Sequence, residues 1–139
     1  MSFALLYGRG KNVGRQTLTD PSPEMIEEAI NELLPALDYF VVLESNPPIK
    51  NIAYVQTAIK NDNNDKPEIM YIIEVNEKTD DSFIQYRRYA EDANEVKKLF
   101  RMFALGIIPD ISEWENVTEE IKNLPEIETK WRKALEKSK

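Results

Sequence analysis

The chain has 139 residues, 42% of them hydrophobic and 31% charged, which is enough apolar surface for one buried core. It contains no cysteine and no histidine, so disulfides, thiolate nucleophiles, imidazole bases and nearly all soft-metal sites are excluded. The net charge of −7 disfavours nucleic acid and anionic lipid and favours basic partners. Residues 21–90 hold 13 acidic and six basic side chains, so the negative charge is concentrated there.

Length and hydropathy also bear on location and domain count. No apolar run approaches the roughly 20 residues that cross a bilayer. The apolar part of residues 1–10 is too short for a secretory signal. We therefore expect a cytoplasmic protein with a single α+β domain over residues 1–139, in which a C-terminal helix at 125–138 could be an appendage.

The N-terminal segment predicts a strand followed by a turn. Phe3 to Tyr7 is a short apolar run that ends at Gly8, and an edge position in a sheet is one option for it. The glycines and bases of residues 8–15 invite comparison with phosphate-binding loops, but three residues separate Gly10 from Gly14 and no Lys-Ser/Thr pair follows. A hairpin or loop is favoured, with residues 16–18 extended.

A first helix is predicted from residue 20 to about Pro35. Ser22 can cap the free amides, and Pro23 suits the first helical position. Apolar residues then repeat with helical period, opposite a glutamate-rich face, at Ile26, Ala29, Ile30, Leu33, Leu34 and Leu37.

Four strands are predicted next, at 39–44, 52–58, 69–75 and 83–89. The links between them, at 45–48, 61–67 and 76–81, are turn-rich and too short for a crossover helix. Neighbouring strands should therefore pair as an antiparallel meander, giving a sheet of about four to six strands. In the last strand, alternation gives each face both an aromatic residue and an arginine, so neither is a simple core face.

Helical patterns return after the strands. Asp92 and Glu95 form a capping-box pattern, and apolar residues repeat at helical spacing until Gly106 supplies a stop. A short helix is predicted around 117–122 and a last one from about Pro125.

Three acidic groupings are candidates for chemical sites. Residues 62–65 (Asp-Asn-Asn-Asp) lack the glycine and the bidentate glutamate of a calcium-binding EF-hand loop, so a hairpin tip is favoured. The pairs Glu27/Glu28 and Glu119/Glu120 are adjacent on helices and point in different directions, which is poor geometry for acid/base catalysis. We therefore predict no catalytic residues, no metal site and no cofactor.

Polar side chains interrupt the otherwise apolar strands, and edge positions or a solvated sheet face would account for them. The alternative is an exposed recognition patch bordered by tyrosines. Trp114 is either an interface anchor or, as we favour, a plug over one end of the core. The candidate partner-binding residues are Glu44, Tyr54, Gln56, Tyr71, Glu74, Gln85, Arg87 and Trp114.

The order of these features resembles the first immunity protein family of bacterial polymorphic-toxin systems, over about residues 18–117. The C-terminal helix and the basic N-terminal turn are not part of the resemblance. The features that carry it are the helix 20–34, the strand ends Val41-Val42-Leu43-Glu44, Tyr54-Val55-Gln56 and Ile72-Ile73-Glu74-Val75, the helix 94–106, and Trp114.

The resemblance implies an α+β protein without catalytic residues that binds and neutralises a cognate toxin domain, often a nucleic-acid-modifying enzyme. An acidic surface would suit such a toxin, because it could fill the basic groove that receives phosphates. Two alternatives stay open: a small-molecule or peptide-binding adaptor domain, and an enzyme using carboxylate with tyrosine or arginine groups. Sequence does not decide the oligomeric state.

Overall fold

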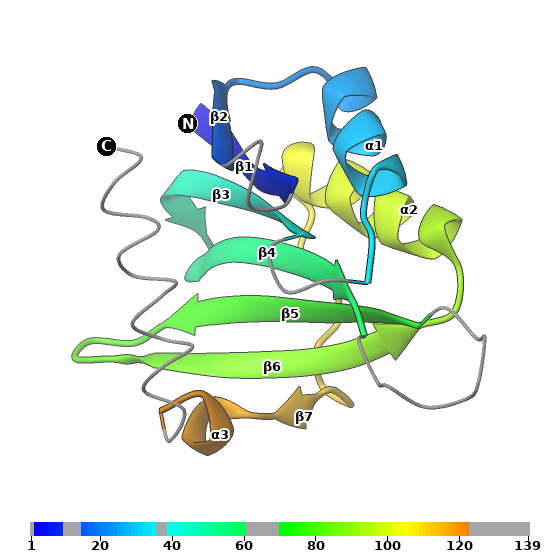
Figure 1. Cartoon of the computed structure of the whole chain (residues 1–139). Coiled ribbons are helices and arrows are strands. Elements are labelled where there is room, and N and C mark those ends of the chain that lie inside the picture. The colour runs from blue at the N-terminus through cyan, green and yellow to red at the C-terminus, as the bar shows by residue number, and fades with distance from the viewer. Residues whose placement is uncertain (1, 10–14, 36–38, 61–69, 123–139) are drawn as a thin grey trace.

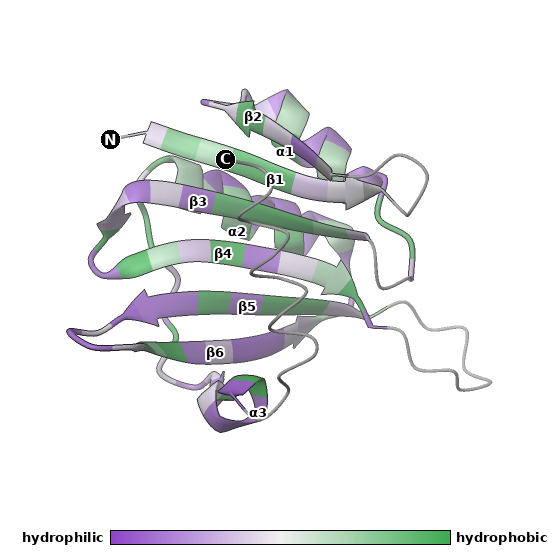
Figure 2. Ribbon diagram, turned by 60° about the vertical axis from the view of Figure 1, so that its left-hand side comes forward, coloured by the Kyte–Doolittle hydropathy of each residue, from purple (hydrophilic) through white to green (hydrophobic). Residues whose placement is uncertain are grey.

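The computed structural model of the chain describes residues 2–9, 15–35, 39–60 and 70–122. They form one antiparallel sheet with two helices on one side of it and a short third helix near its last strand (Figures 1 and 2). The elements are β1 (Ser2–Arg9), β2 (Arg15–Thr19), α1 (Pro23–Asn31), β3 (Tyr39–Ile49), β4 (Ile52–Ile59), β5 (Tyr71–Lys78), β6 (Phe83–Ala90), α2 (Ala93–Ala104), β7 (Glu115–Asn116) and α3 (Thr118–Lys122).

The predicted α+β class is confirmed, and β3 to β6 form the expected meander. The sheet has seven strands in the order β2-β1-β3-β4-β5-β6-β7. Seven exceeds the four to six expected, because β7 has only two residues and leaves no periodic signal in the sequence. The short helix predicted at 117–122 is present as α3.

The edge position considered for the first strand is wrong. β1 pairs with β2 on one side and with β3 on the other, so β2 forms the edge. Between β2 and β3 the chain forms α1, which lies beside α2 on the same side of the sheet (Figure 1). The link between β1 and β2 agrees with the hairpin interpretation of residues 8–15, since Gly8 pairs with Arg15.

β3 is longer than predicted and runs through Pro47 and Pro48 to Ile49. Prolines lack the amide that a central strand needs. Here the register with β4 shifts between Glu44 and Ile49, while β1 pairs with β3 only up to Asn46. The prolines therefore lie in the part of β3 where its pairing with neighbouring strands is interrupted. The sequence predicts this part, residues 45–48, as a link between strands.

The first helix begins as predicted but ends early. The Ser22 side chain accepts a hydrogen bond from the Met25 amide, and Pro23 opens the helix. α1 ends at Asn31, and the Leu33 amide bonds to Ile30 in a tighter turn. Pro35 disfavours helical geometry at the residue before it, so the stripe through Leu34 does not extend the helix.

The second helix agrees with the prediction at both ends. The Asp92 side chain caps α2 by accepting from the Asn94 amide. Gly106, at φ 85°, takes the left-handed conformation that ends the helix, and the Ile107 amide returns to the Met102 carbonyl. Glu95 departs from the capping-box pattern, because its carboxylate binds Arg88 on β6.

The hydrophobic core lies between the sheet and the helices. Alternate residues of β1, β3, β4 and β5 point toward α1 and α2, as the period of two requires. Trp114 packs against this core from the segment that follows α2, in agreement with the plug interpretation. The core residues with no exposed surface are Leu5, Val41, Leu43, Val55, Ile73, Val75, Val96, Phe100 and Phe103.

Three predictions fall outside the described residues: the C-terminal helix at 125–138, the hairpin tip at 62–65 and the glycine-rich residues 10–14. Within the described ranges, α2 is the longest helix at 12 residues. None of these helices has the length and apolar character needed to cross a bilayer.

Truncating a core aromatic residue tests this packing. Phe100 on α2 has no exposed surface, so Phe100→Ala should lower the free energy of unfolding by about 3–5 kcal/mol through lost burial and a residual cavity. Denaturant titration measures the change. Met102→Ala, on the exposed side of the same helix, should cost only about 0.5 kcal/mol. Equal losses would contradict the described packing of α2.

Candidate functional site

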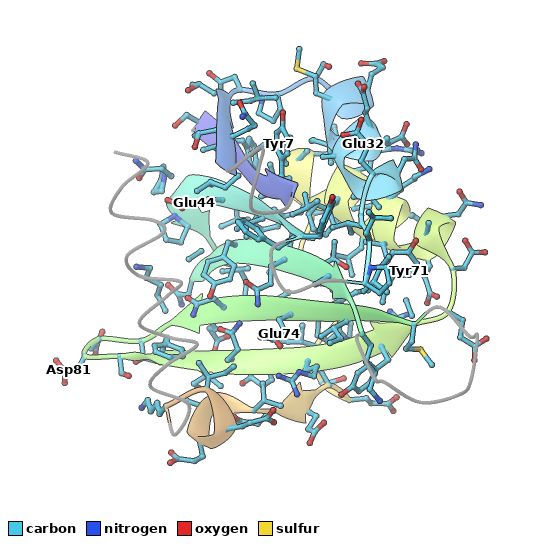
Figure 3. All side chains as sticks on the ribbon, viewed as in Figure 1. Tyr7, Glu32, Glu44, Tyr71, Glu74 and Asp81 are labelled. Carbon is cyan, nitrogen blue, oxygen red and sulfur yellow. The ribbon has the colours of Figure 1, made fainter. Side chains whose placement is uncertain are left out.

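The sheet face opposite α1 and α2 carries most of the predicted site residues. Strand pairing places Glu44 opposite Tyr54, Gln56 opposite Glu74, and Glu74 opposite Arg87. Figure 3 shows Glu74 near the middle of the sheet and Glu44 on β3. We call six residues of this face the sheet-face network: Tyr54, Gln56, Glu74, Asn76, Gln85 and Arg87.

Two predicted residues lie elsewhere. Tyr71 belongs to the other face of β5 and packs against the core, at the end of the strand near α2 (Figure 3). Burial, and then the charge of Asp92, raise the pKa of the Tyr71 phenol. Trp114 packs against the same core. The structure therefore separates these two aromatic residues from the sheet-face network.

Glu74 is the centre of the sheet-face network. Its Oε1 accepts hydrogen bonds from Gln56 Nε2 at 3.1 Å and from Gln85 Nε2 at 2.8 Å. Its Oε2 accepts from Arg87 Nε at 2.9 Å and lies 2.8 Å from Arg87 Nη2. A carboxylate with only 4% of its residue surface exposed thus has both oxygens engaged.

Gln85 joins the network to the last part of the sheet. Its Oε1 accepts from Asn76 Nδ2 at 3.0 Å and from the Tyr54 hydroxyl at 3.4 Å. Its backbone amide donates to Thr118 Oγ1, and its carbonyl accepts from the Val117 amide. The strand β6 is therefore fixed on one side by side chains of the sheet and on the other by the segment that leads into α3.

Arg87 connects β5 with α3. One edge of its guanidinium binds Glu74, and Nη1 donates to both oxygens of Glu120, at 3.0 and 3.2 Å. Burial alone would lower the pKa of Arg87, but the carboxylates of Glu74 and Glu120 raise it above the usual range. The guanidinium therefore stays charged between two carboxylates and ties the short helix to the sheet.

Tyr54 is a titratable member of the network whose pKa is shifted chiefly by burial. Burial raises the pKa of the Tyr54 phenol to about 12, and the charges of Glu74 and Glu44 act in the same direction. The hydrogen bonds with Gln85 and Asn76 oppose this rise. A neutral phenol is the form compatible with this site at any ordinary pH.

The prediction that these residues form an exposed patch is wrong for Glu74 and Gln85, which are 4% and 2% exposed. Tyr54, Gln56 and Arg87 are partly buried, and Glu44 is exposed. Buried polar groups must find partners inside the protein, and these have found one another. Four of the polar interruptions thus form a network that is largely internal, which is neither of the two arrangements that the sequence suggested: Gln56, Glu74, Gln85 and Arg87.

Sequence reasoning missed four members or neighbours of this arrangement. Asn76 follows Glu74 at the spacing of two that puts residues on one face of a strand, so its membership could have been found. The other three come from the region of β7 and α3, which pairs with β6 only through tertiary structure. They are Asn116, Thr118 and Glu120.

The described contacts give the network a structural role. The Arg87 guanidinium neutralises the buried Glu74 carboxylate and also binds the exposed carboxylate of Glu120. In the part of the chain that the structure describes, no three acidic side chains are grouped so that they could hold a metal ion.

Comparisons with models of known protein families, with curated proteins and with solved structures found no match. Function therefore has to be inferred from the residues and surfaces of this chain.

Removing the guanidinium at the centre of the network should destabilise the protein strongly. Arg87→Met leaves the Glu74 carboxylate buried without its cation, so the free energy of unfolding should fall by about 3–5 kcal/mol. The neighbouring arginine is the matched control. Arg88→Met breaks an exposed pair with Glu95 and should cost about 0.2–1 kcal/mol.

Denaturant titration of both variants measures the difference. The double variant Glu74→Gln/Arg87→Met removes both charges and should recover part of the stability that Arg87→Met loses. An Arg88→Met variant that is as unstable as Arg87→Met would contradict the central position of Glu74 and Arg87.

Tyr54 should make stability fall at alkaline pH. The phenol has a pKa of 10.0 when unperturbed and about 12 in the fold, so the unfolded chain loses this proton first. Its contribution is complete below pH 10 and is lost as the pH rises toward 12, by about 3 kcal/mol in all. Tyr54→Phe should flatten this alkaline decline in unfolding free energy, whereas Tyr89→Phe, at an exposed residue, should leave it unchanged.

Proposed function

We propose that the chain is an immunity protein, which binds a cognate toxin domain and neutralises it by occluding a basic substrate site. The observation that carries the proposal is an acidic hairpin tip that projects past the rest of the sheet. Asp80 and Asp81 are exposed at this tip, between β5 and β6. Figure 3 labels Asp81 at its far end, pointing away from the molecule.

The hairpin tip is held in a defined shape. The amide of Lys78 donates to the carbonyl of Asn51, in the turn between β3 and β4, at 2.7 Å. Beyond it the Thr79 amide bonds to the Ser82 carbonyl, and the Ser82 amide bonds to Thr79 Oγ1. A turn that is ordered before binding loses less conformational entropy when it enters a partner's cleft.

The chemistry of the tip suits a nucleic-acid-acting partner. Two neighbouring carboxylates present the charge that a phosphodiester backbone would present, so they can compete for the lysines and arginines of a substrate groove. The overall charge of −7 would steer a basic domain toward the protein, with an effect that falls as salt rises.

The sheet-face network links the two strands that lead to the hairpin tip. β5 and β6 carry Glu74, Asn76, Gln85 and Arg87, so the two strands that end in the hairpin are also joined through their side chains. Phe83 of β6 also contacts α3, because the Lys122 ammonium lies 5.6 Å from the centroid of its ring. Because these contacts hold the hairpin in place, the tip would bind a partner without first being ordered, and less conformational entropy would be lost on binding.

The resemblance of residues 18–117 to the first immunity protein family points to the same function, by analogy. A toxin of this kind would act on nucleic acid in the cytoplasm, where the two proteins would meet. In this proposal the chain contributes binding and no catalytic group, and it needs no cofactor or metal.

Charge reversal at the hairpin tip tests the proposal. Co-expression of this chain with the toxin domain encoded beside it should rescue growth, and Asp80→Lys/Asp81→Lys should weaken toxin binding at least tenfold and abolish rescue. The matched control is Glu24→Lys/Glu28→Lys on α1, which changes the net charge equally at exposed residues. Titration calorimetry at two salt concentrations measures both affinities.

The α1 variant should still rescue growth. Its affinity should fall less than that of the hairpin variant, because it loses only the long-range attraction due to net charge. Full rescue by the hairpin variant would exclude the tip as the contact. Failure of the unchanged protein to rescue cells or to bind the toxin would overturn the proposed function itself.

A further inference from the structure

The strand β2 lies at one edge of the described sheet. It pairs with β1 without any register shift, from Ala4 opposite Thr19 to Gly8 opposite Arg15. Among the described strands it has a single neighbour, because the sheet order begins with it. The side chains of Gln16, Thr17 and Thr19 are exposed. A row of backbone groups is therefore open to another strand.

The hydrogen bond next to the strand shows which backbone groups face outward. The Asp20 amide donates to the Phe3 carbonyl at 2.7 Å, so this pair belongs to the bonded positions of the ladder. Bonded and non-bonded pairs alternate in an antiparallel ladder. Leu18 and Gln16 therefore bond to β1, and the amides and carbonyls of Thr17 and Thr19 point away from the sheet.

β2 begins with the charged Arg15, but the four residues that follow lack the charges, prolines and bulges that protect edge strands. Their sequence, Gln-Thr-Leu-Thr, has no charge and no proline, and the pairing has no bulge. The end of the strand is also well anchored, because the Asp20 carboxylate accepts the Phe3 amide at 3.1 Å. β2 is thus an edge strand with a regular register, and it carries two threonines that favour strand geometry.

The other edge of the described sheet differs in each respect. β7 has two residues and passes directly into α3. The following amide, of Val117, is already bonded to Gln85. A strand added there would find almost no ladder to extend, so β2 is the edge suited to strand addition.

We propose that β2 pairs antiparallel with β2 of a second copy of the chain, with a two-fold axis at Thr17. Thr17 then faces its counterpart, and residues 15 and 19 face each other on both sides of the axis. The backbone amides and carbonyls of residues 15, 17 and 19 point away from β1 and are evenly spaced about Thr17. The same groups of a second copy, related by the two-fold axis, lie opposite them, so up to about six backbone hydrogen bonds can form. The result is a sheet that continues through both copies.

Side-chain chemistry favours a second copy as the occupant. Two copies of an acidic protein repel each other at most surfaces. Along residues 16–19 the side chains are uncharged, so the strands can approach without like charges meeting. The directly opposed Thr17 pair is a favourable cross-strand combination. This inference is independent of the proposed toxin partner.

Substitution of Thr17 tests the pairing. Thr17→Pro removes an amide that points away from β1, and proline is tolerated on an edge strand at such a position. The intact chain and the control Thr17→Val should sediment as a monomer at low micromolar concentration and shift toward a dimer as the concentration approaches millimolar. Thr17→Pro should stay monomeric with an unchanged circular dichroism spectrum.

Amide hydrogen exchange gives a second measurement. Protection of the Thr17 and Thr19 amides should rise with protein concentration, while the Leu18 amide should be protected at every concentration. The proposal is wrong if the chain stays monomeric throughout, even where Thr17→Pro weakens binding of another protein. The proposal is also wrong if Thr17→Pro and the Thr17→Val control dimerise equally strongly.

Discussion

A buried carboxylate sets the strictest requirement in this protein. Glu74 lies in the middle of a central strand, where an uncompensated charge would cost several kcal/mol. Its oxygens are satisfied by Gln56, Gln85 and Arg87, which come from both neighbouring strands. A one-residue slip among β4, β5 and β6 would turn these partners to the other face, so neutralisation of this charge favours the observed register.

The same requirement extends to the end of the described chain. Arg87 needs a second acceptor for its remaining edge, and Glu120 of α3 provides it. Thr118 and Val117 bond to the backbone of Gln85, so β7 and α3 are attached to the sheet through the residues that surround Glu74. A helix of five residues would be unstable alone, and here its position depends on these tertiary contacts.

The two surfaces proposed for binding lie at opposite ends of the sheet order. The acidic tip belongs to β5 and β6, and the open strand belongs to β2. Three strands, β1, β3 and β4, separate β2 from β5, so a second copy on β2 would leave the tip free for a toxin (Figure 1). A dimer would then present two acidic tips, and a partner able to contact both would gain effective affinity from the second contact.

The sequence by itself determined the α+β class, both long helices and the meander, because these depend on local signals. Ser22 and Pro23 begin α1, Gly106 ends α2, and turn-rich links separate the strands β3 to β6. It also identified most residues of the network as polar interruptions of strands. The sequence could not predict the edge position of β2 or the pairing of β7.

Tertiary structure alone decided that Glu74 and Gln85 are buried and that Tyr71 packs against the core. Period-two alternation separates two faces but does not identify the face that helices will cover. Whether a polar side chain is a surface contact or an internal one depends on partners distant in sequence. Glu120, 33 positions from Arg87, is such a partner.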